Sequence, residues 1–119
     1  MGQAFKPIAL VVEDDPDQRN LLSVLLEEAE FHVFTCESAE AGLRLLDKYG
    51  SAMSMLVTDV QLAGNMTGAD LAYVAKHRHP NLSVIVTSGS AEPLLPSDTL
   101  FMPKPWRALD ILRVAERVH

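Results

Sequence analysis

The chain has 119 residues, 48% of them hydrophobic, so it is long and apolar enough to form one folded domain with its own core. Sixteen acidic residues against ten lysines and arginines give a net charge of −6, which argues against the basic surface that direct nucleic-acid binding requires. No apolar stretch approaches the ~18 residues needed to span a bilayer, so we expect no membrane partner.

Short apolar runs alternate with apolar residues at helical spacing, which predicts alternating strands and helices. The first strand is expected over residues 8–13. Asp15 and Pro16 then form a good helix start, because an acidic cap precedes a residue preorganised for the first turn. Residues 32–36 predict a second strand. Between these strands, the first helix is indicated by an apolar stripe of Leu21, Leu22, Leu25, Leu26 and Ala29.

The middle of the chain repeats this pattern. Ser38 is expected to cap a second helix that Gly50 terminates, and residues 54–59 predict the third strand. Residues 67–70 have the spacing of a capping box, with Asp in place of the usual Glu. They predict a third helix that ends before Pro80, because the residue ahead of a proline avoids helical geometry.

The last part of the chain contains a short crossover. Residues 82–87 predict the fourth strand, and residues 88–98 separate it from the fifth, although a parallel crossover usually needs about a dozen residues or more. Pro93 and Pro96 lack backbone donors, so we expect the fourth helix to be shortened or irregular. A clearer last helix carries the apolar residues Trp106, Leu109, Leu112, Val114, Ala115 and Val118.

Polar residues follow the predicted strands where each strand ends. Glu13 and Asp14 follow the first strand, Asp59 closes the third, Thr87 closes the fourth and Lys104 follows the fifth. In a parallel sheet these ends share the edge where open α/β folds place their ligands. The pattern predicts that the carboxylates hold a divalent cation and that Asp59 accepts a phosphoryl group.

At these residues the chain resembles the receiver domain of two-component response regulators. The matching pieces are residues 11–15 (Val-Val-Glu-Asp-Asp), 58–62 (Thr-Asp-Val-Gln-Leu) followed by Gly68, 86–88 (Val-Thr-Ser) and 104–106 (Lys-Pro-Trp). They occur in the family's order over nearly the whole chain. The resemblance implies an α/β fold with three layers, a flavodoxin-like doubly wound sheet of five parallel strands in the order 2-1-3-4-5.

The resemblance also implies a chemistry. Asp59 would accept a phosphoryl group from a sensor histidine kinase or a histidine phosphotransfer protein. Asp14 and Asp59 would ligate Mg²⁺ directly, Glu13 through water and Gln61 through its backbone carbonyl, with Mn²⁺ able to substitute. Lys104 would stabilise the phosphoryl oxygens. Beyond this self-phosphorylation from phosphodonors and autodephosphorylation, no enzyme activity is expected.

Signalling would follow from the same site. In the family, a hydroxyl at the position of Thr87 moves toward the phosphoryl group and an aromatic residue at the position of Phe101 rotates inward. The output surface would lie near residues 91–118, with a downstream protein partner or a homodimer as its target. The resemblance further implies a cis peptide bond between Lys104 and Pro105, and the loop after Asp59 is one residue longer than is common.

Simpler interpretations stay open for single residues. Thr87 alone would be a turn hydroxyl and Lys104 a solvated charge, and Phe101 is as readily a packed core residue as a switch. The four histidines show no ligand spacing and are expected at the surface. Four methionines are expected to pack in the interior, namely Met53, Met55, Met66 and Met102.

Two other functions and the domain context also stay open. A haloacid-dehalogenase-like phosphatase would need a second Asp two residues after Asp59, where this chain has Gln61, and a pseudo-receiver scaffold would not need the intact set of site residues. We expect residues 1–119 to form a single receiver domain with a flexible tail over residues 1–6. The lone Cys36 suits a cytoplasmic protein. The domain would act alone or belong to a hybrid kinase or larger regulator.

Overall fold

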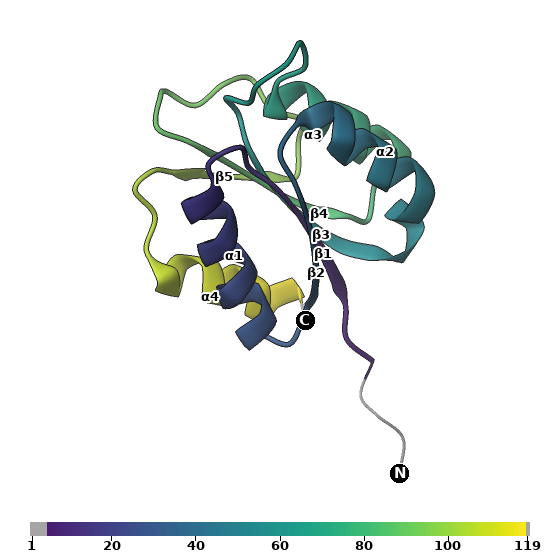
Figure 1. Ribbon diagram of the computed structural model, residues 1–119. Helices are drawn as coiled ribbons and strands as arrows, with labels where there is room; N and C mark the ends of the chain where they lie inside the picture. Colours follow the sequence, from purple (N-terminus) through teal and green to yellow (C-terminus); the bar gives the residue numbers. More distant parts are fainter. Residues whose placement is uncertain (1–4, 119) are drawn as a thin grey trace.

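The computed structural model describes residues 5–118, which form a five-stranded parallel sheet in the order β2-β1-β3-β4-β5 (Figure 1). The strands are β1 (Ile8–Val12), β2 (His32–Cys36), β3 (Met53–Asp59), β4 (Ser83–Ser88) and β5 (Thr99–Pro103). The helices are α1 (Pro16–Glu28), α2 (Ala39–Tyr49), α3 (Gly68–Arg78) and α4 (Ala108–Val118), with a 3-10 turn at Gly50–Ala52. The predicted fold class and strand order are therefore confirmed, and the strand bounds agree with the sequence to within about one residue.

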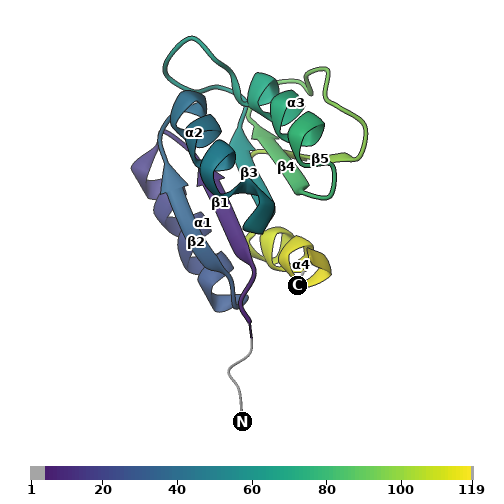
Figure 2. The same ribbon diagram turned by 90° about the vertical axis from the view of Figure 1, so that its right-hand side faces the viewer.

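The helices cover both faces of the sheet. Helices α1 and α4 lie on one face, and α2 and α3 lie on the other (Figures 1 and 2). Because successive side chains of a strand point to opposite faces, β1 contributes to two separate cores. Ala9 and Val11 pack toward α1 and α4, whereas Leu10 and Val12 pack toward α2 and α3. The sheet is thus the buried middle layer, and its strand ends are where polar groups can meet.

The predicted helix starts are confirmed in detail. The Asp15 side chain accepts a hydrogen bond from the backbone of Asp17 at 3.4 Å, and Ser38 accepts one from Ala41 at 3.1 Å. Thr67 and Asp70 form a reciprocal capping box, with both hydrogen bonds at 3.0 Å. These caps satisfy backbone donors that the first turn of a helix leaves free. They fix where α1, α2 and α3 begin after their strands.

Helix α2 ends at Tyr49, directly before Gly50, as predicted. Gly50 keeps right-handed helical backbone angles, so its freedom to adopt positive φ is not used. A Cβ atom at this position would lie 2.3 Å from Nε2 of His79. The imidazole ring of His79 therefore packs against the Gly50 backbone, and a larger residue here would have to displace that ring.

The crossover from β4 to β5 contains no helix. The predicted shortening of the fourth helix is confirmed in its irregular form, since no helical turn is present between Ser88 and Thr99. Leu95 packs against the core beside α3, but Leu94 is 87% exposed. This coil, residues 89–98, brings β5 beside β4 without a covering helix.

Other sequence predictions concern single residues. The four interior methionines pack in or against the two cores, and the Lys104–Pro105 peptide bond is cis. His32 and His77 are exposed and His79 is half-buried, whereas His119 lies outside the described residues. Residues 1–4 of the predicted tail also lie outside them. Within the described residues, no helix is long and apolar enough to cross a bilayer.

Candidate functional site

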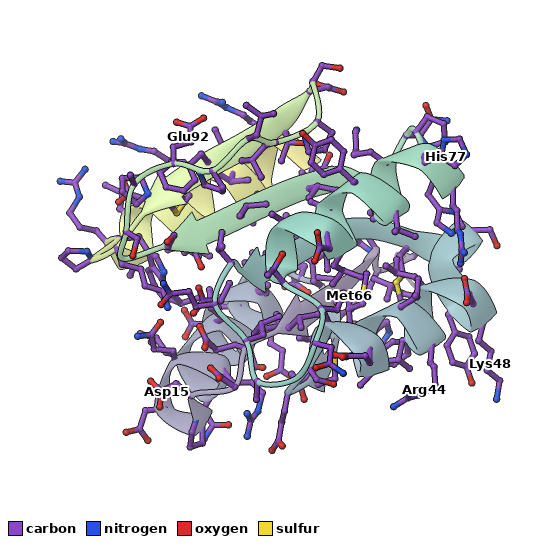
Figure 3. The ribbon with its side chains drawn as sticks, turned by 90° about the horizontal axis from the view of Figure 1, so that it is seen from above. Asp15, Arg44, Lys48, Met66, His77 and Glu92 are labelled. Atoms are coloured by element: carbon purple, nitrogen blue, oxygen red, sulfur yellow. The ribbon has the colours of Figure 1, made fainter. Side chains whose placement is uncertain are left out.

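Buried polar side chains gather at one edge of the sheet. Among residues 5–118, the polar or charged residues classed as buried are Glu13, Thr58, Asp59, Thr87 and Ser88. All five lie at or just after the carboxyl ends of β1, β3 and β4. Because burying such groups costs free energy unless they are paired, their concentration at one edge indicates a functional site. Figure 3 views the molecule from above, with Asp15 labelled at the start of α1.

Lys104 joins the ends of three strands. Its Nζ lies 2.6 Å from Oδ2 of Asp59 and 3.3 Å from Oε1 of Glu13. Its backbone amide donates to the carbonyl of Ser88 at 2.8 Å, which fixes the chain leaving β5 against the end of β4. The structure thus brings a cation 45 residues beyond Asp59 and 91 beyond Glu13 into contact with both carboxylates.

Three carboxylates form a group that suits a divalent cation. One oxygen from each of Glu13, Asp14 and Asp59 lies within 4.8 Å of the others, and Asp14 is exposed to solvent while the other two are buried. Carboxylates ~4 Å apart repel by about 1–4 kcal/mol, depending on screening. An all-oxygen donor set with one side open to water fits Mg²⁺, which keeps part of its hydration shell.

The surroundings of the site raise the pKa values of both Glu13 and Lys104. Burial, and then the neighbouring charge of Asp59, raise the pKa of Glu13, although a hydrogen bond from the Asp15 backbone and the charge of Lys104 oppose the rise. Burial alone would lower the pKa of Lys104, but its hydrogen bond to Asp59 and the charges of Asp59 and Glu13 outweigh burial and raise it. Lys104 therefore stays charged at neutral pH, where it contacts the carboxyl groups of Asp59 and Glu13.

Asp59 is held tightly by its surroundings. Its Oδ1 accepts a hydrogen bond from the backbone of Gln61 at 3.2 Å, and its carbonyl accepts one from the hydroxyl of Thr58 at 3.0 Å. The next amide, of Val60, donates to the carbonyl of Thr87 at 2.9 Å. A Cβ at Gly68 would lie only 1.7 Å from the carbonyl oxygen of Asp59, so α3 starts in direct contact with this residue.

The remaining predicted residues lie around this centre. Thr87 is buried and faces Asp59 in the β3–β4 register. The side chain of Gln61 is exposed, and its Nε2 lies 3.4 Å from Oγ of Ser90. Phe101 is half-buried in β5, and strand alternation places it on the face opposite Met102, toward α3.

Sequence reasoning missed a second cation beside the site. Arg19 of α1 donates from Nη1 to the carbonyl of Glu13 at 2.9 Å, and its Nη2 lies 3.5 Å from Oε1 of Glu37. The side chain of Arg19 is only 17% exposed. Its place on the polar side of α1, one turn after the cap, was the only available signal, and that signal is common to many solvated arginines.

Two residues near the site have packing roles. Burial raises the pKa of Cys36 to about 11, so its thiol is protonated and unreactive at neutral pH. Trp106 packs against the core beside α1 and lines an open pocket together with Leu21 and Lys104. Trp106 was expected in the last helix but precedes it, because the helix starts two residues later, at Ala108.

Two comparisons of the sequence with known proteins point to the same family. The family model described as "Response regulator receiver domain" matches residues 9–100. The response regulator receiver protein CpdR of Brucella abortus is 29% identical over 115 residues, which is 92% of this chain and 93% of CpdR.

Solved structures share the fold at lower identity. A response regulator receiver protein from Sinorhizobium medicae superimposes with a TM-score of 0.85 at 22% identity, covering 95% of this chain and 94% of that one. The receiver domain of the hybrid histidine kinase CckA gives a TM-score of 0.82 at 22% identity, with 93% and 97% covered.

Proposed function

Because the chain belongs to the family of response regulator receiver domains, which act in two-component signalling, we propose that Asp59 accepts a phosphoryl group from a phosphohistidine. The donor is a sensor histidine kinase or a histidine phosphotransfer protein. The observation that carries this proposal is the contact of Lys104 Nζ with Asp59 Oδ2 at 2.6 Å, at the centre of the carboxylate group.

The transfer exchanges one bond for another. A carboxylate oxygen of Asp59 forms a bond to phosphorus, the bond from phosphorus to the donor imidazole nitrogen breaks, and its electron pair leaves with the imidazole. Lys104 stabilises the negative charge on the phosphoryl oxygens from one side. The hydrogen bond from the Gln61 amide holds the carboxylate in position for attack.

The carboxylate group makes this reaction dependent on a divalent cation. When bound, Mg²⁺ or Mn²⁺ supplies positive charge that offsets both the acids and the incoming phosphoryl oxygens. Asp14 and Asp59 would hold the ion directly, Glu13 would hold it through water, and Gln61 would contribute its backbone carbonyl. Without such a cation, the excess negative charge of the buried acids repels the phosphodonor.

Phosphorylation then changes the surface of the domain. The hydroxyl of Thr87 turns toward the phosphoryl group, and Phe101 moves inward behind it, on the β5 side of the sheet. A change from 1:99 to 99:1 between two states needs roughly 5.5 kcal/mol of differential stabilisation, which a few charge-assisted hydrogen bonds can provide. The surface of residues 91–118 carries the signal to a protein partner or a second copy of the chain.

Residues 1–119 act as a single receiver domain, and the reducing cytoplasm is the compartment that suits them. Autodephosphorylation by water ends the signal. We propose no enzyme activity for the domain beyond this process and self-phosphorylation from phosphodonors.

Intact-mass spectrometry after incubation with acetyl phosphate and Mg²⁺ tests the proposal. We expect one phosphoryl adduct on the wild-type protein, lost when the cation is chelated and absent from Asp59→Asn. A folded protein that binds Mg²⁺ but never forms the adduct would be a pseudo-receiver scaffold. Turnover of a small phosphate ester would indicate a phosphatase.

A further inference from the structure

The loop between β3 and α3, residues 60–67, is held by a residue of a different element. Glu40, in the first turn of α2, accepts a hydrogen bond at Oε2 from the backbone amide of Asn65, at 3.0 Å. Glu40 and Asn65 are 25 residues apart in sequence. Figure 3 shows this loop, with Met66 labelled in it and Arg44 marking α2. The hydrogen bond joins the middle of the loop to α2.

Gly64, the residue before Asn65, leaves room for the Glu40 carboxylate. Gly64 has a φ angle of +102°, a conformation that favours glycine, and a Cβ there would lie 2.9 and 3.0 Å from the two carboxylate oxygens of Glu40. Backbone hydrogen bonds, first from Glu40 itself and then from Asn65, with a further contribution from Met66, lower the pKa of Glu40. The carboxylate therefore sits charged against an exposed turn of backbone.

This loop is also the one that encloses Asp59. At its start, the Gln61 amide donates to Oδ1 of Asp59, and at its end the Gly68 amide donates to the carbonyl of Val60 at 2.9 Å. The same loop carries Gln61, to which a backbone ligand role is assigned in the proposed function. Gln61 and the segment that Glu40 contacts thus lie in one backbone loop whose ends are joined by the Gly68–Val60 hydrogen bond.

The segment that carries Glu13 is held from the residues just before α2. Glu37, three residues before Glu40, pairs with Arg19, and Arg19 donates to the carbonyl of Glu13. Glu40 thus contacts the loop that follows Asp59, and Glu37 contacts the Glu13 segment through Arg19, although neither residue belongs to the carboxylate group itself.

We propose that Glu40 is a positioning residue that holds the loop of residues 60–67 so that Gln61 and Asp59 keep their relative arrangement for cation binding. Glu40 touches neither the cation nor the phosphoryl group and acts through Gly64 and Asn65. This inference rests on the proposed function, because it assigns Gln61 and Asp59 to one cation site.

The test uses the whole chain and three variants. Glu40→Ala removes the acceptor, Glu40→Gln keeps an oxygen acceptor without the charge, and Glu28→Ala removes an exposed acid from the last turn of α1 as a charge-matched control. For each protein, ¹⁵N spectra give the Mg²⁺ concentration at half-saturation and the hydrogen exchange rate of the Asn65 amide. Acetyl phosphate reactions at varied Mg²⁺ give the half-saturation and the maximal rate.

We expect Glu40→Ala to raise the Mg²⁺ half-saturation by about tenfold, in the range seen when groups behind metal ligands are removed. The maximal phosphorylation rate at saturating Mg²⁺ should change little, and the Asn65 amide should exchange faster. Glu40→Gln should recover part of the affinity, and Glu28→Ala should match the wild type. A merely structural role would lower thermal stability without this separation of half-saturation from maximal rate.

The outcomes separate the two proposals. If the wild type forms the adduct and Glu40→Ala binds Mg²⁺ within twofold of it, the positioning role is wrong and the proposed function stands. If the wild type forms no adduct but Glu40→Ala still weakens Mg²⁺ binding and frees the Asn65 amide, the positioning role stands and the phosphoacceptor function falls. Should Glu40→Ala fail to fold, Gly64→Ala takes its place, because the added Cβ would displace the Glu40 carboxylate, and an unchanged Mg²⁺ affinity in that variant would likewise overturn the positioning role.

Discussion

Two crossovers on the same side of the sheet are built in opposite ways. Between β3 and β4 the chain forms α3, which starts with a capping box and buries Leu71, Ala72 and Ala75. Between β4 and β5 it runs as the coil of residues 89–98, with Leu94 almost fully exposed. Asp59 precedes the rigid crossover, whereas Thr87 and Phe101 lie on the strands that flank the irregular one.

Because no helix precedes β5, other contacts help to hold this strand in place. Its carboxyl end is attached through Lys104, by the backbone bond to Ser88 and the side-chain bonds to Asp59 and Glu13. At the other end, Lys76 of α3 donates to the carbonyls of Pro80 and Leu82 and pairs with Asp98 at 3.4 Å. These polar contacts add to the β4–β5 ladder and to the packing of Met102 in the core that α1 and α4 cover.

Two glycines at the two crossovers give the largest expected contrast. Gly68→Ala would force a Cβ against the carbonyl of Asp59, so we expect a loss of about 3 kcal/mol or more in unfolding free energy, together with loss of phosphorylation. Gly89→Ala meets no atom within 4 Å and should stay within about 0.5 kcal/mol of the wild type. Chemical denaturation measures both, and equal effects would contradict the comparison.

The Lys104 contacts should give the next largest effect. Lys104→Met removes the cation from two buried carboxylates, and we expect a loss of about 3 kcal/mol at pH 7. Because the pKa of Lys104 is raised, its contribution is complete below the ordinary lysine value and disappears only as pH rises through the raised value.

On the acid side this deficit should shrink. Because burial raises the pKa of Glu13, this residue takes up a proton earlier than an ordinary carboxyl group as pH falls, and the buried charge disappears. Denaturation midpoints of wild type and Lys104→Met between pH 4 and pH 8 measure the effect. A deficit that grows toward low pH would contradict the assigned role of Lys104.

The sequence was informative where local rules decide the structure. The caps Asp15, Ser38 and Thr67 and the apolar runs of the strands follow from spacing and residue type alone. The same rules predicted that Pro93 and Pro96 would disturb the crossover after β4. They also predicted the shared edge of Glu13, Asp59, Thr87 and Lys104, because parallel strands align their carboxyl ends.

What the sequence could not supply were contacts between side chains and distant backbone. Arg19 on the Glu13 carbonyl and Glu40 on the Asn65 amide depend on how loops meet in space, which no periodicity records. The contact of Gly50 with His79 is likewise non-local, although Gly50 was predicted to end its helix.

The capping box allows a finer test of the contrast. Thr67→Ala removes the hydroxyl that accepts the Asp70 amide, and we expect a loss of about 1 kcal/mol in unfolding free energy. As the matched change in the coil, Ser90→Ala alters an exposed hydroxyl and should cost less than about 0.5 kcal/mol. A larger loss for Ser90→Ala would mean that the coil is as tightly specified as α3.

The smallest expected effect concerns Leu94. Its side chain is 87% exposed, so Leu94→Ser should change the unfolding free energy by less than about 0.5 kcal/mol. Amide hydrogen exchange should show the same contrast, with slow exchange in α3 and fast exchange through residues 89–98. Slow hydrogen exchange of the amides in residues 89–98 of the isolated protein would contradict the irregular coil described for this crossover.

The most direct test of the central claim locates the phosphoryl group. After reaction with acetyl phosphate and Mg²⁺, borohydride reduces an aspartyl phosphate to homoserine, which peptide mass mapping can place in the sequence. We expect homoserine at position 59 and nowhere else, and only when the divalent cation was present. Modification of another residue, or none in folded protein that binds Mg²⁺, would contradict the assignment of Asp59 as the phosphoacceptor.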